Sequence, residues 1–490
     1  MNDATLRSNT VNSLVWKLFE RGGNAIVQLI VQIIMARLLA PEEFGALAIM
    51  LVFVNLGSMF VISGFNTALV QSPEVDEGDC STVFWISLAI ASILYITIFL
   101  FAPFVASFYG LNSLTWPLRA LTLVLLIGAY NTVQVAIVQR RLQFRKVFNA
   151  TIVSVVLSGG IGVAAAVLNA GLWALVIQQL CYSLCNCVVM AFQVKWRPGF
   201  VFKPDRARQL FSFSWKLLVS GILDQGYQSL SDLIIGKQFS ASSLGLVSQG
   251  KKYPQAVGNM LDGAIQPVML SAVSRVQADV PYVKRLVRRA LKTSTFLIVP
   301  SMTLFAAAAE PIVGILLGRK WLSCVPFLQM YCFIYALLPI HTTNLQALNG
   351  MGRSDLFLKL ELIKKAYGIF FILFAAFVLK DVYLMVAMYM ITGVISTFVN
   401  AYPNKRVIGY SYSEQLRDIA PAFAISAIAG GLALFCGSYI VSPELQILVE
   451  TAVMTIAYLG IAGIFKLEAF EYLITTIRDF LVQSVVNGTA

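Results

Sequence analysis

Residues 37–45 read RLLAPEEFG, and 200 positions later residues 237–245 read KQFSASSLG. A basic residue, a bulky apolar residue and a glycine recur at matching places: Arg37, Phe44 and Gly45 against Lys237, Leu244 and Gly245. Further pairs recur at slowly growing offsets: Trp16-Lys17-Leu18 with Trp215-Lys216-Leu217, Pro103 with Pro311, Gly110 with Gly318, and Asn131-Thr132 with His341-Thr342. This pattern indicates a duplicated chain, and twin membrane bundles are a recurring plan of transporters.

The composition predicts an all-α membrane protein. The 490 residues are 58% hydrophobic and 12% charged, and about 20 apolar residues cross a bilayer as a helix. The apolar runs are long and continuous, whereas membrane strands would show short alternating segments. We predict about fourteen membrane spans: 14–39, 44–70, 81–108, 116–138, 147–168, 171–193, 210–239, 243–273, 290–317, 323–349, 356–379, 382–402, 416–440 and 445–465.

The repeat divides these spans into two pseudo-symmetric lobes of six helices each, followed by two additional helices. We predict an N-terminal lobe at 1–200 and a C-terminal lobe at 201–403. The last two spans and a cytoplasmic tail occupy 404–490. All connections are short, so the spans themselves are expected to carry the function.

Basic residues orient the chain by the positive-inside rule. They gather in the connections after even-numbered spans: Arg140, Arg141, Arg145 and Lys146, then Lys195, Arg197, Lys203, Arg206 and Arg208, then Lys284, Arg285, Arg288, Arg289 and Lys292. Both termini are therefore predicted to be cytoplasmic. The connection after the second span departs from this trend, because its charged residues are Glu74, Asp76, Glu77 and Asp79.

Three predicted helices carry polar residues along one face, at steps of three and four. The first has Lys17, Arg21, Asn24, Gln28 and Gln32, the seventh has Lys216, Ser220, Asp224, Gln228 and Ser231, and the eighth has Ser248, Lys252, Gln255, Asn259, Asp262 and Gln266, with Lys251 adjacent. Ionisable residues inside a membrane usually face a bundle interior or a water-filled cavity. The alternative for Lys17 and Lys216 is that they extend to the lipid headgroups from the helix ends.

These faces predict a hydrated cavity with a net positive charge, which favours an anionic cargo. The predicted substrate-binding residues are Lys17, Arg21, Lys216, Lys251, Lys252, Gln255 and Asn259. Asp224, Asp232 and Asp262 are candidates for coupling transport to a proton or sodium ion, and structural ion pairs are their alternative.

No cofactor, metal site or disulfide framework is predicted, because the seven cysteines are scattered without a Cys-x-x-Cys pair. His341 is the sole histidine, and its repeat counterpart is Asn131, so we interpret it as a polar helix residue. The net charge of +12 is explained by basic loops that meet anionic lipid headgroups. Nucleic acid is not an expected partner.

Several motifs together resemble the Wzx-type polysaccharide flippases of the multidrug/oligosaccharidyl-lipid/polysaccharide superfamily, in particular the lipopolysaccharide and colanic-acid exporters. They are the run Ala36 to Gly45, Ala68-Leu69-Val70-Gln71, Phe84-Trp85, the run Gln139 to Arg145, Trp196-Arg197-Pro198, Asp232, Ile235-Gly236, Pro254 and Pro267. The resemblance implies two six-helix lobes around a V-shaped cavity in the bacterial inner membrane. It also implies export of an undecaprenyl-pyrophosphate-linked oligosaccharide from the cytoplasmic to the periplasmic leaflet. Membrane lipids and the polysaccharide polymerase or assembly machinery are the partners it implies.

Two other functions stay open at this point. An ion-coupled multidrug exporter of the same superfamily would need buried carboxylates in excess, whereas basic residues are in excess here. An integral-membrane glycan polymerase or ligase would be expected to carry a large periplasmic loop and a catalytic constellation. Neither feature is apparent in this sequence, so we do not expect an enzyme.

Overall fold

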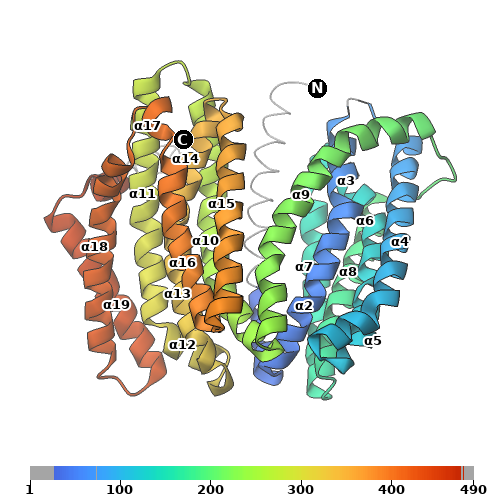
Figure 1. Cartoon of the computed structure of the whole chain (residues 1–490), viewed down its shortest axis with the longest axis horizontal. Helices are drawn as coiled ribbons and strands as arrows, with labels where there is room; N and C mark the ends of the chain where they lie inside the picture. The colour runs from blue at the N-terminus through green and yellow to red at the C-terminus, as the bar shows by residue number, and fades with distance from the viewer. Residues whose placement is uncertain (1–26, 73, 476–477, 479–490) are drawn as a thin grey trace, which may run out of the picture. The chain divides into compact units, whose positions relative to one another are not determined.

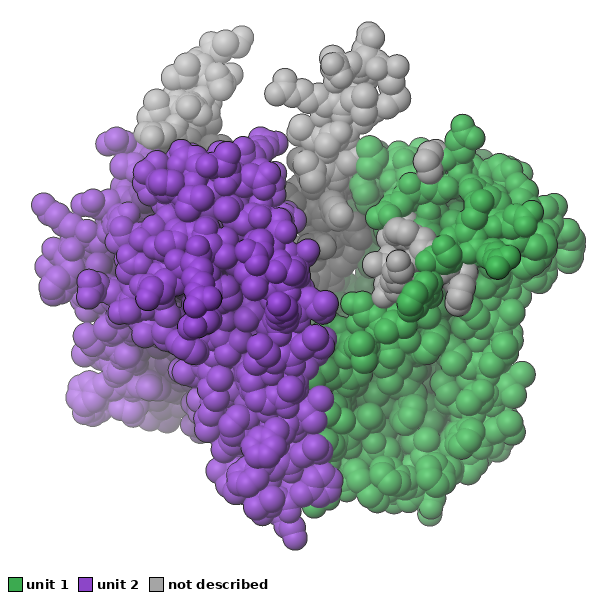
Figure 2. Space-filling view, turned by 45° about the horizontal axis from the view of Figure 1, so that its top comes forward, with its two compact units in different colours: residues 1–245 green, residues 246–490 purple. Residues whose placement is uncertain are grey.

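The protein is built of helices throughout residues 27–72, 74–475 and 478, the part that the computed structural model describes (Figure 1). The predicted all-α fold class is confirmed. The chain divides into two compact units, Met1–Gly245 and Leu246–Ala490, coloured green and purple in Figure 2. The lobe limits at residues 200 and 403 stay a prediction.

Unit 1 packs its helices around two apolar clusters. After a helix at Val27–Leu38 it contains α2 (Pro41–Ser58), the π-helical turn η1 (Met59–Ser63), α3 (Gly64–Gln71), α4 (Glu77–Tyr109), the 3₁₀ turn η2 (Asn112–Leu114), α5 (Thr115–Leu121), α6 (Leu123–Arg140), α7 (Phe144–Val167), α8 (Leu172–Val194) and α9 (Pro204–Gln238). Helix α6 packs on both α4 and α8, while α9 lies against α2, α3 and α4.

Unit 2 contains most of α10 (Ala241–Arg275) and the helices that follow. They are α11 (Val280–Ala307), α12 (Ala309–Leu316), the 3₁₀ turn η3 (Arg319–Cys324), α13 (Val325–Ala336), α14 (Leu338–Gly350), α15 (Ser354–Phe374), the π-helical turn η4 (Ala375–Leu379), α16 (Val382–Ala401), α17 (Asn404–Val407), α18 (Tyr412–Gly437) and α19 (Pro443–Ile464). Helix α11 is central, since it packs against α13, α14 and α18.

Eleven helical segments within the described residues are long and apolar enough to cross a membrane, so the chain is a multi-pass membrane protein. The three predicted spans outside this set are 14–39, 210–239 and 243–273, the ones with polar faces. The first lies partly outside the described residues. Helices α9 and α10 are 35 residues long, or about 50 Å at 1.5 Å per residue, but their polar faces lower their mean hydropathy. The count of fourteen depends on these three.

The two halves of the chain interrupt their fourth span in the same way. In the first half η2, α5 and α6 follow one another, and the break is at Thr122, where ψ is −12°. In the second half η3, α13 and α14 follow one another, and the break is at Leu337, where ψ is −10°. This shared irregularity supports the duplication that the sequence repeat predicts.

The quoted repeat also forms a reciprocal contact inside unit 1, between the first turns of α2 and α10. A Cβ atom on Gly45 would lie 1.7 Å from the carbonyl oxygen of Ala241, and a Cβ atom on Gly245 would lie 2.0 Å from that of Pro41. Only glycine permits two backbones to approach so closely. The repeated glycines are therefore required by helix packing.

Helix α18, which begins the additional pair α18–α19, is joined to α11 by ion pairs at one helix end. Arg288 Nε and Nη2 donate to the two carboxylate oxygens of Asp418 at 2.7 and 2.8 Å. Lys292 Nζ lies 3.1 Å from Asp418 and 2.6 Å from Glu468. Lys284, Arg288 and Lys292, spaced four residues apart along α11, therefore each form an ion pair with a later segment of the chain.

Replacing Asp418 with asparagine is expected to lower the thermal unfolding midpoint of the detergent-solubilised protein. The Asp418 side chain is 7% exposed and forms ion pairs with two basic residues. The loss in free energy of unfolding should therefore lie between about 1 kcal/mol, typical of exposed pairs, and about 3 kcal/mol, typical of buried ones. The matched control is Asp355→Asn, because Asp355 pairs with Arg353 with both side chains about half exposed. Equal midpoints for the two variants would contradict the prediction.

Candidate functional site

The predicted substrate-binding residues are only partly within the described structure. Lys17 and Arg21 lie outside the described residues. Lys216 lies on α9, but its side chain is outside the described part of the chain. The grouping of these three with the lysines of α10 therefore stays a prediction.

The polar face predicted for residues 243–273 lies on one continuous helix, α10, despite its two internal prolines. A different face of α10 packs against α13, where Gly250 and Gly258 lie close to Phe327 and Tyr335. Helical geometry places Lys252, Gln255 and Asn259 on a common face beside this packed face.

These side chains are accessible to different degrees. Lys251, Lys252 and Gln255 are half-buried, and Asn259 is exposed. Neither lysine forms an ion pair with any residue that the structure describes. Half-buried, unpaired ammonium groups on a membrane helix can each donate hydrogen bonds to an anionic group.

The three candidate coupling carboxylates have separate environments. Asp224 on α9 is exposed, and its Oδ2 accepts a hydrogen bond from the amide of Gln228 at 2.9 Å. Asp232 is half-buried on the same helix. Asp262 on α10 accepts a hydrogen bond from the Thr342 hydroxyl of α14. Ion coupling by these residues stays a prediction.

His341 makes the contact expected of a polar helix residue. Its Nδ1 lies 3.0 Å from Nδ2 of Asn400, which joins α14 to α16. In the other half, the repeat counterpart Asn131 donates to Asn186 Oδ1 at 3.0 Å and joins α6 to α8. The polar bridge between the fourth and sixth spans is thus preserved in both halves.

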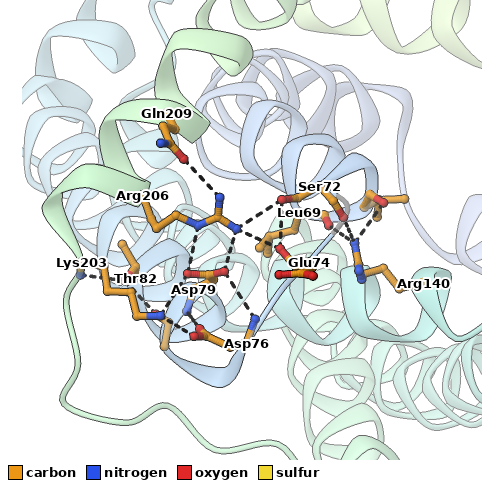
Figure 3. Close-up of polar contacts among 12 residues, drawn as sticks. Leu69, Ser72, Glu74, Asp76, Asp79, Thr82, Arg140, Lys203, Arg206 and Gln209 are labelled. Atoms are coloured by element: carbon orange, nitrogen blue, oxygen red, sulfur yellow. Dashed lines mark hydrogen bonds and ion pairs between the residues drawn. The ribbon is translucent and has the colours of Figure 1, made fainter.

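A dense set of charges lies where α3 ends and α9 begins, and we call Asp76, Asp79, Lys203 and Arg206 the charge clamp (Figure 3). Asp76 is the N-cap of α4, and Asp79 completes its capping box. The Asp79 side chain is only 5% exposed and lies 2.9 Å from Arg206 and 3.4 Å from Lys203. The same carboxylate therefore caps α4 and binds two bases of the α8–α9 connection.

Backbone hydrogen bonds reinforce this attachment. The Ser81 and Thr82 hydroxyls of α4 each accept a backbone N–H at 3.0 Å, from Gly199 and Lys203 respectively. The Trp85 indole donates to the Gly199 carbonyl at 3.0 Å. Successive turns of α4 therefore hold the connection that leads into α9.

Arg140, at the end of α6, closes the other side of the same region (Figure 3). Its guanidinium donates to the backbone carbonyls of Leu69, Val70 and Ser72, at the C-terminal end of α3. The last carbonyls of a helix have no partner within the helix, so a cation placed there is stabilising. Arg140 is thus a structural residue as well as part of the orientation signal.

Electrostatics favour the clamp at neutral pH. The hydrogen bond from Lys203 is the main reason why the pKa of the Asp76 carboxyl lies below its usual value. A lowered carboxyl pKa means that the pair stabilises the folded state at neutral pH, and that this stabilisation is lost as pH falls through the lowered value.

Sequence reasoning missed this clamp, although both halves of it were visible. In the sequence, the acidic connection after the second span is an exception to the charge trend, and Lys203 and Arg206 indicate only orientation. Their opposite charges, in connections expected on the same side of the membrane, are the signal that links them. Which carboxylate meets which base depended on the packing of α9 against α3 and α4.

Comparison with known proteins assigns the chain to a family. Residues 34–326 match the family described as polysaccharide biosynthesis protein. The chain belongs to that family. The resemblance inferred from the sequence motifs is confirmed.

Individual proteins similar to this chain are transporters. It is 26% identical over 350 residues to the succinoglycan biosynthesis transport protein ExoT of Rhizobium meliloti, which covers 71% of each chain. The lipid II flippase MurJ, in an inward closed conformation, has the same fold, with a TM-score of 0.75 and 15% identity over 95% of this chain and 100% of MurJ. An inward-facing multidrug resistance transporter of the MATE family, from the MOP superfamily, reaches a TM-score of 0.55 and 14% identity over 78% of this chain and 95% of its own.

In this polysaccharide biosynthesis protein, replacing Asp79 with alanine should destabilise unit 1 by about 3 kcal/mol, because the change removes a buried carboxylate from two bases and from the cap of α4. Thermal unfolding in detergent measures the loss. Glu74→Ala is the matched control, since only the backbone carbonyl of Glu74 contacts Arg206 and its side chain is exposed. A control variant as unstable as Asp79→Ala would argue against the clamp.

Proposed function

We propose that this protein carries an undecaprenyl-pyrophosphate-linked oligosaccharide from the cytoplasmic to the periplasmic leaflet of the bacterial inner membrane. The cargo would be a repeat unit of O-antigen, colanic acid or another exopolysaccharide. Movement would follow alternating access, in which two lobes rock around a central site.

One observation carries the proposal: a chain of the polysaccharide biosynthesis family matches the full length of the lipid II flippase MurJ in fold. Lipid II is named there as the flipped molecule, and the relative ExoT is named as a succinoglycan biosynthesis transport protein. From a flippase of a lipid and a transport protein of polysaccharide biosynthesis, we infer a lipid-linked sugar as the cargo class of this chain. A polysaccharide polymerase and its assembly machinery are proposed as partners.

The cationic set predicted from the sequence would hold the pyrophosphate. Arginine can bind phosphate oxygens in pairs and lysine acts as a compact positive charge, so Arg21 and the lysines Lys17, Lys216, Lys251 and Lys252 are the proposed ligands. Gln255 and Asn259 follow Lys252 along the same face of α10 and offer amide groups to sugar hydroxyls.

We also propose that both termini are cytoplasmic. The positive-inside rule is the primary support. The charge clamp adds to it, because connections after the second and sixth spans pair with one another, and Arg140 from the end of the fourth span binds beside them. Connections after even-numbered spans are expected on a common side, and in unit 1 they meet at one end (Figure 3).

Ion coupling is the proposed energy source, with Asp224, Asp232 and Asp262 as candidate carriers. Asp262 is favoured over Asp224, because Asp262 is half-buried and accepts a hydrogen bond from the neutral Thr342 hydroxyl, whereas Asp224 is exposed. A multidrug exporter of the same superfamily is the second candidate. It is less supported, because the MATE transporter matches this fold less well than MurJ does. The transport relatives likewise argue against a polymerase or ligase.

A reconstitution experiment tests the proposal. Purified protein in lipid vesicles should expose a fluorescent undecaprenyl-pyrophosphate oligosaccharide on the opposite leaflet, where a membrane-impermeant quencher detects it. An imposed pH or sodium gradient should accelerate this exposure if the candidate carboxylates couple an ion. Protein-free vesicles and a sugar-free lipid are the controls. Transport of a cationic drug with no movement of the lipid-linked sugar would favour the exporter instead.

A further inference from the structure

A cavity of about 310 Å³ opens at the end of unit 1 that holds the charge clamp. Its walls come from the ends of α3, α6 and α8 and the start of α4. Membrane-spanning helices terminate around it: Glu77 begins one, while Arg140 and Val194 end two others. The cavity therefore lies at the depth where lipid headgroups meet water.

Charges of both signs line this cavity. Arg140 and Arg141 come from the end of α6, and Lys195 follows α8, whereas Asp76 and Glu77 come from the start of α4. Arg140 is occupied by the carbonyls of α3, and Asp76 by Lys203. The other three residues, Arg141, Lys195 and Glu77, make no ion pair within the described part of the chain. Two cations and one carboxylate are therefore left to meet a ligand.

The neighbouring residues add a donor and an apolar wall. Trp196 lines the cavity and is 8% exposed, and its indole N–H has no hydrogen-bond partner among the described residues. Lys195 itself adopts the left-handed conformation, with φ at 57°, where glycine is favoured. Apolar contact is available from Leu69, Ile137 and Val194.

We propose that this cavity binds the phosphoethanolamine headgroup of a membrane lipid. The phosphate oxygens accept hydrogen bonds from Arg141 and Lys195, and the primary ammonium donates to the Glu77 carboxylate. The apolar wall contacts the part of the lipid next to its headgroup. None of the proposed transport residues is among those that line the cavity, and the proposal does not depend on which cargo is carried.

The mixed charge of the walls selects this chemistry. A purely anionic headgroup would satisfy Arg141 and Lys195 but would bring negative charge towards Glu77. A choline headgroup has a quaternary ammonium without N–H groups, so it cannot donate to a carboxylate. The pyrophosphate of the proposed cargo shares the phosphate chemistry, which makes it the other source that an experiment must distinguish.

Lipid titration of the purified full-length chain tests this proposal. Phosphatidylethanolamine, phosphatidylcholine, phosphatidylglycerol and undecaprenyl pyrophosphate are each added to detergent-solubilised protein, and binding is followed by native mass spectrometry and by the unfolding midpoint. We expect phosphatidylethanolamine to bind most tightly. The double change Arg141→Gln and Lys195→Gln should weaken it about 100-fold, because two charge-assisted hydrogen bonds to the phosphate are lost.

Two further variants sharpen the result. Glu77→Gln should abolish the preference for phosphatidylethanolamine over phosphatidylcholine, with at most a small fall in the lipid-free midpoint, because Glu77 lies in the first turn of α4 and makes no ion pair with a described residue. Arg197→Gln is the matched control, because Arg197 is exposed, lies two residues after Lys195 and does not line the cavity. Equal binding of all phospholipids, or binding unchanged by the double variant, would overturn the proposal. Tighter binding of undecaprenyl pyrophosphate that the double variant abolishes would assign the site to the cargo instead.

Discussion

Gly45→Ala is expected to prevent the chain from accumulating as a folded membrane protein. The new methyl carbon would lie 1.7 Å from the carbonyl oxygen of Ala241, and this oxygen belongs to the backbone, which cannot rotate away as a side chain can. Overpacking a core with one side chain costs about 1–3 kcal/mol, and moving a backbone should exceed that range. Since a domain is stable by only about 5–15 kcal/mol, a large fraction of the molecules should misfold.

The yield of monodisperse protein after detergent extraction and size-exclusion chromatography measures this effect. Gly245→Ala should behave similarly, because its Cβ atom would meet the Pro41 carbonyl at 2.0 Å. Gly160→Ala is the matched control: Gly160 also lies within a helix, α7, and a Cβ atom there would meet nothing within 4 Å. Wild-type yield from Gly45→Ala would show that the first turns of α2 and α10 can separate at little cost.

Replacing both Lys251 and Lys252 with alanine is expected to abolish transport while the protein remains folded and at its normal level in the membrane. Both residues are half-buried on α10 and have no ion-pair partner among the described residues. If they bind the pyrophosphate as proposed, two hydrogen bonds to a charged group are lost, each contributing about 1.5–3 kcal/mol. That loss corresponds to a fall in the transport rate of about 100-fold or more.

The vesicle assay described above measures this rate, and membrane levels are compared by immunoblot. The double change Lys405→Ala and Arg406→Ala is the control, because it removes another adjacent pair of bases, which are exposed on α17. Unchanged transport by the Lys251 and Lys252 variant would remove both residues from the mechanism. A fall in membrane level of the same size would mean that they act in folding.

Much of the architecture was predictable because membrane spans are a local property of the sequence. Length and hydropathy predicted the eleven apolar spans found within the described residues. The polar steps of three and four also predicted the helices α9 and α10, while the span at 14–39 lies partly outside the described residues. The duplication was visible in residues as far apart as Asn131 and His341. The structure gives these two equivalent partners, Asn186 and Asn400.

The functional residues were less predictable. Spacing placed Lys252, Gln255 and Asn259 on a single face of α10, and that helix is continuous. The sequence assigned Lys203 and Arg206 only to orientation, whereas the structure pairs them with Asp79. A charge count along the chain cannot separate a base that holds a neighbouring helix from one that is left to bind a ligand.

By itself, the sequence determined that this is a duplicated, helical, multi-pass membrane protein, and its motifs indicated the polysaccharide exporters. Only the tertiary structure decided which bases are paired, with Arg206 and Arg288 held by carboxylates and Arg141 and Lys195 left beside a cavity. Only the structure shows that Gly45 and Gly245 must be glycines, because the backbone of a neighbouring helix lies against each of them. The physical reason is range: hydropathy and helical period act over neighbouring residues, whereas an ion pair or a backbone contact depends on which distant helix ends meet.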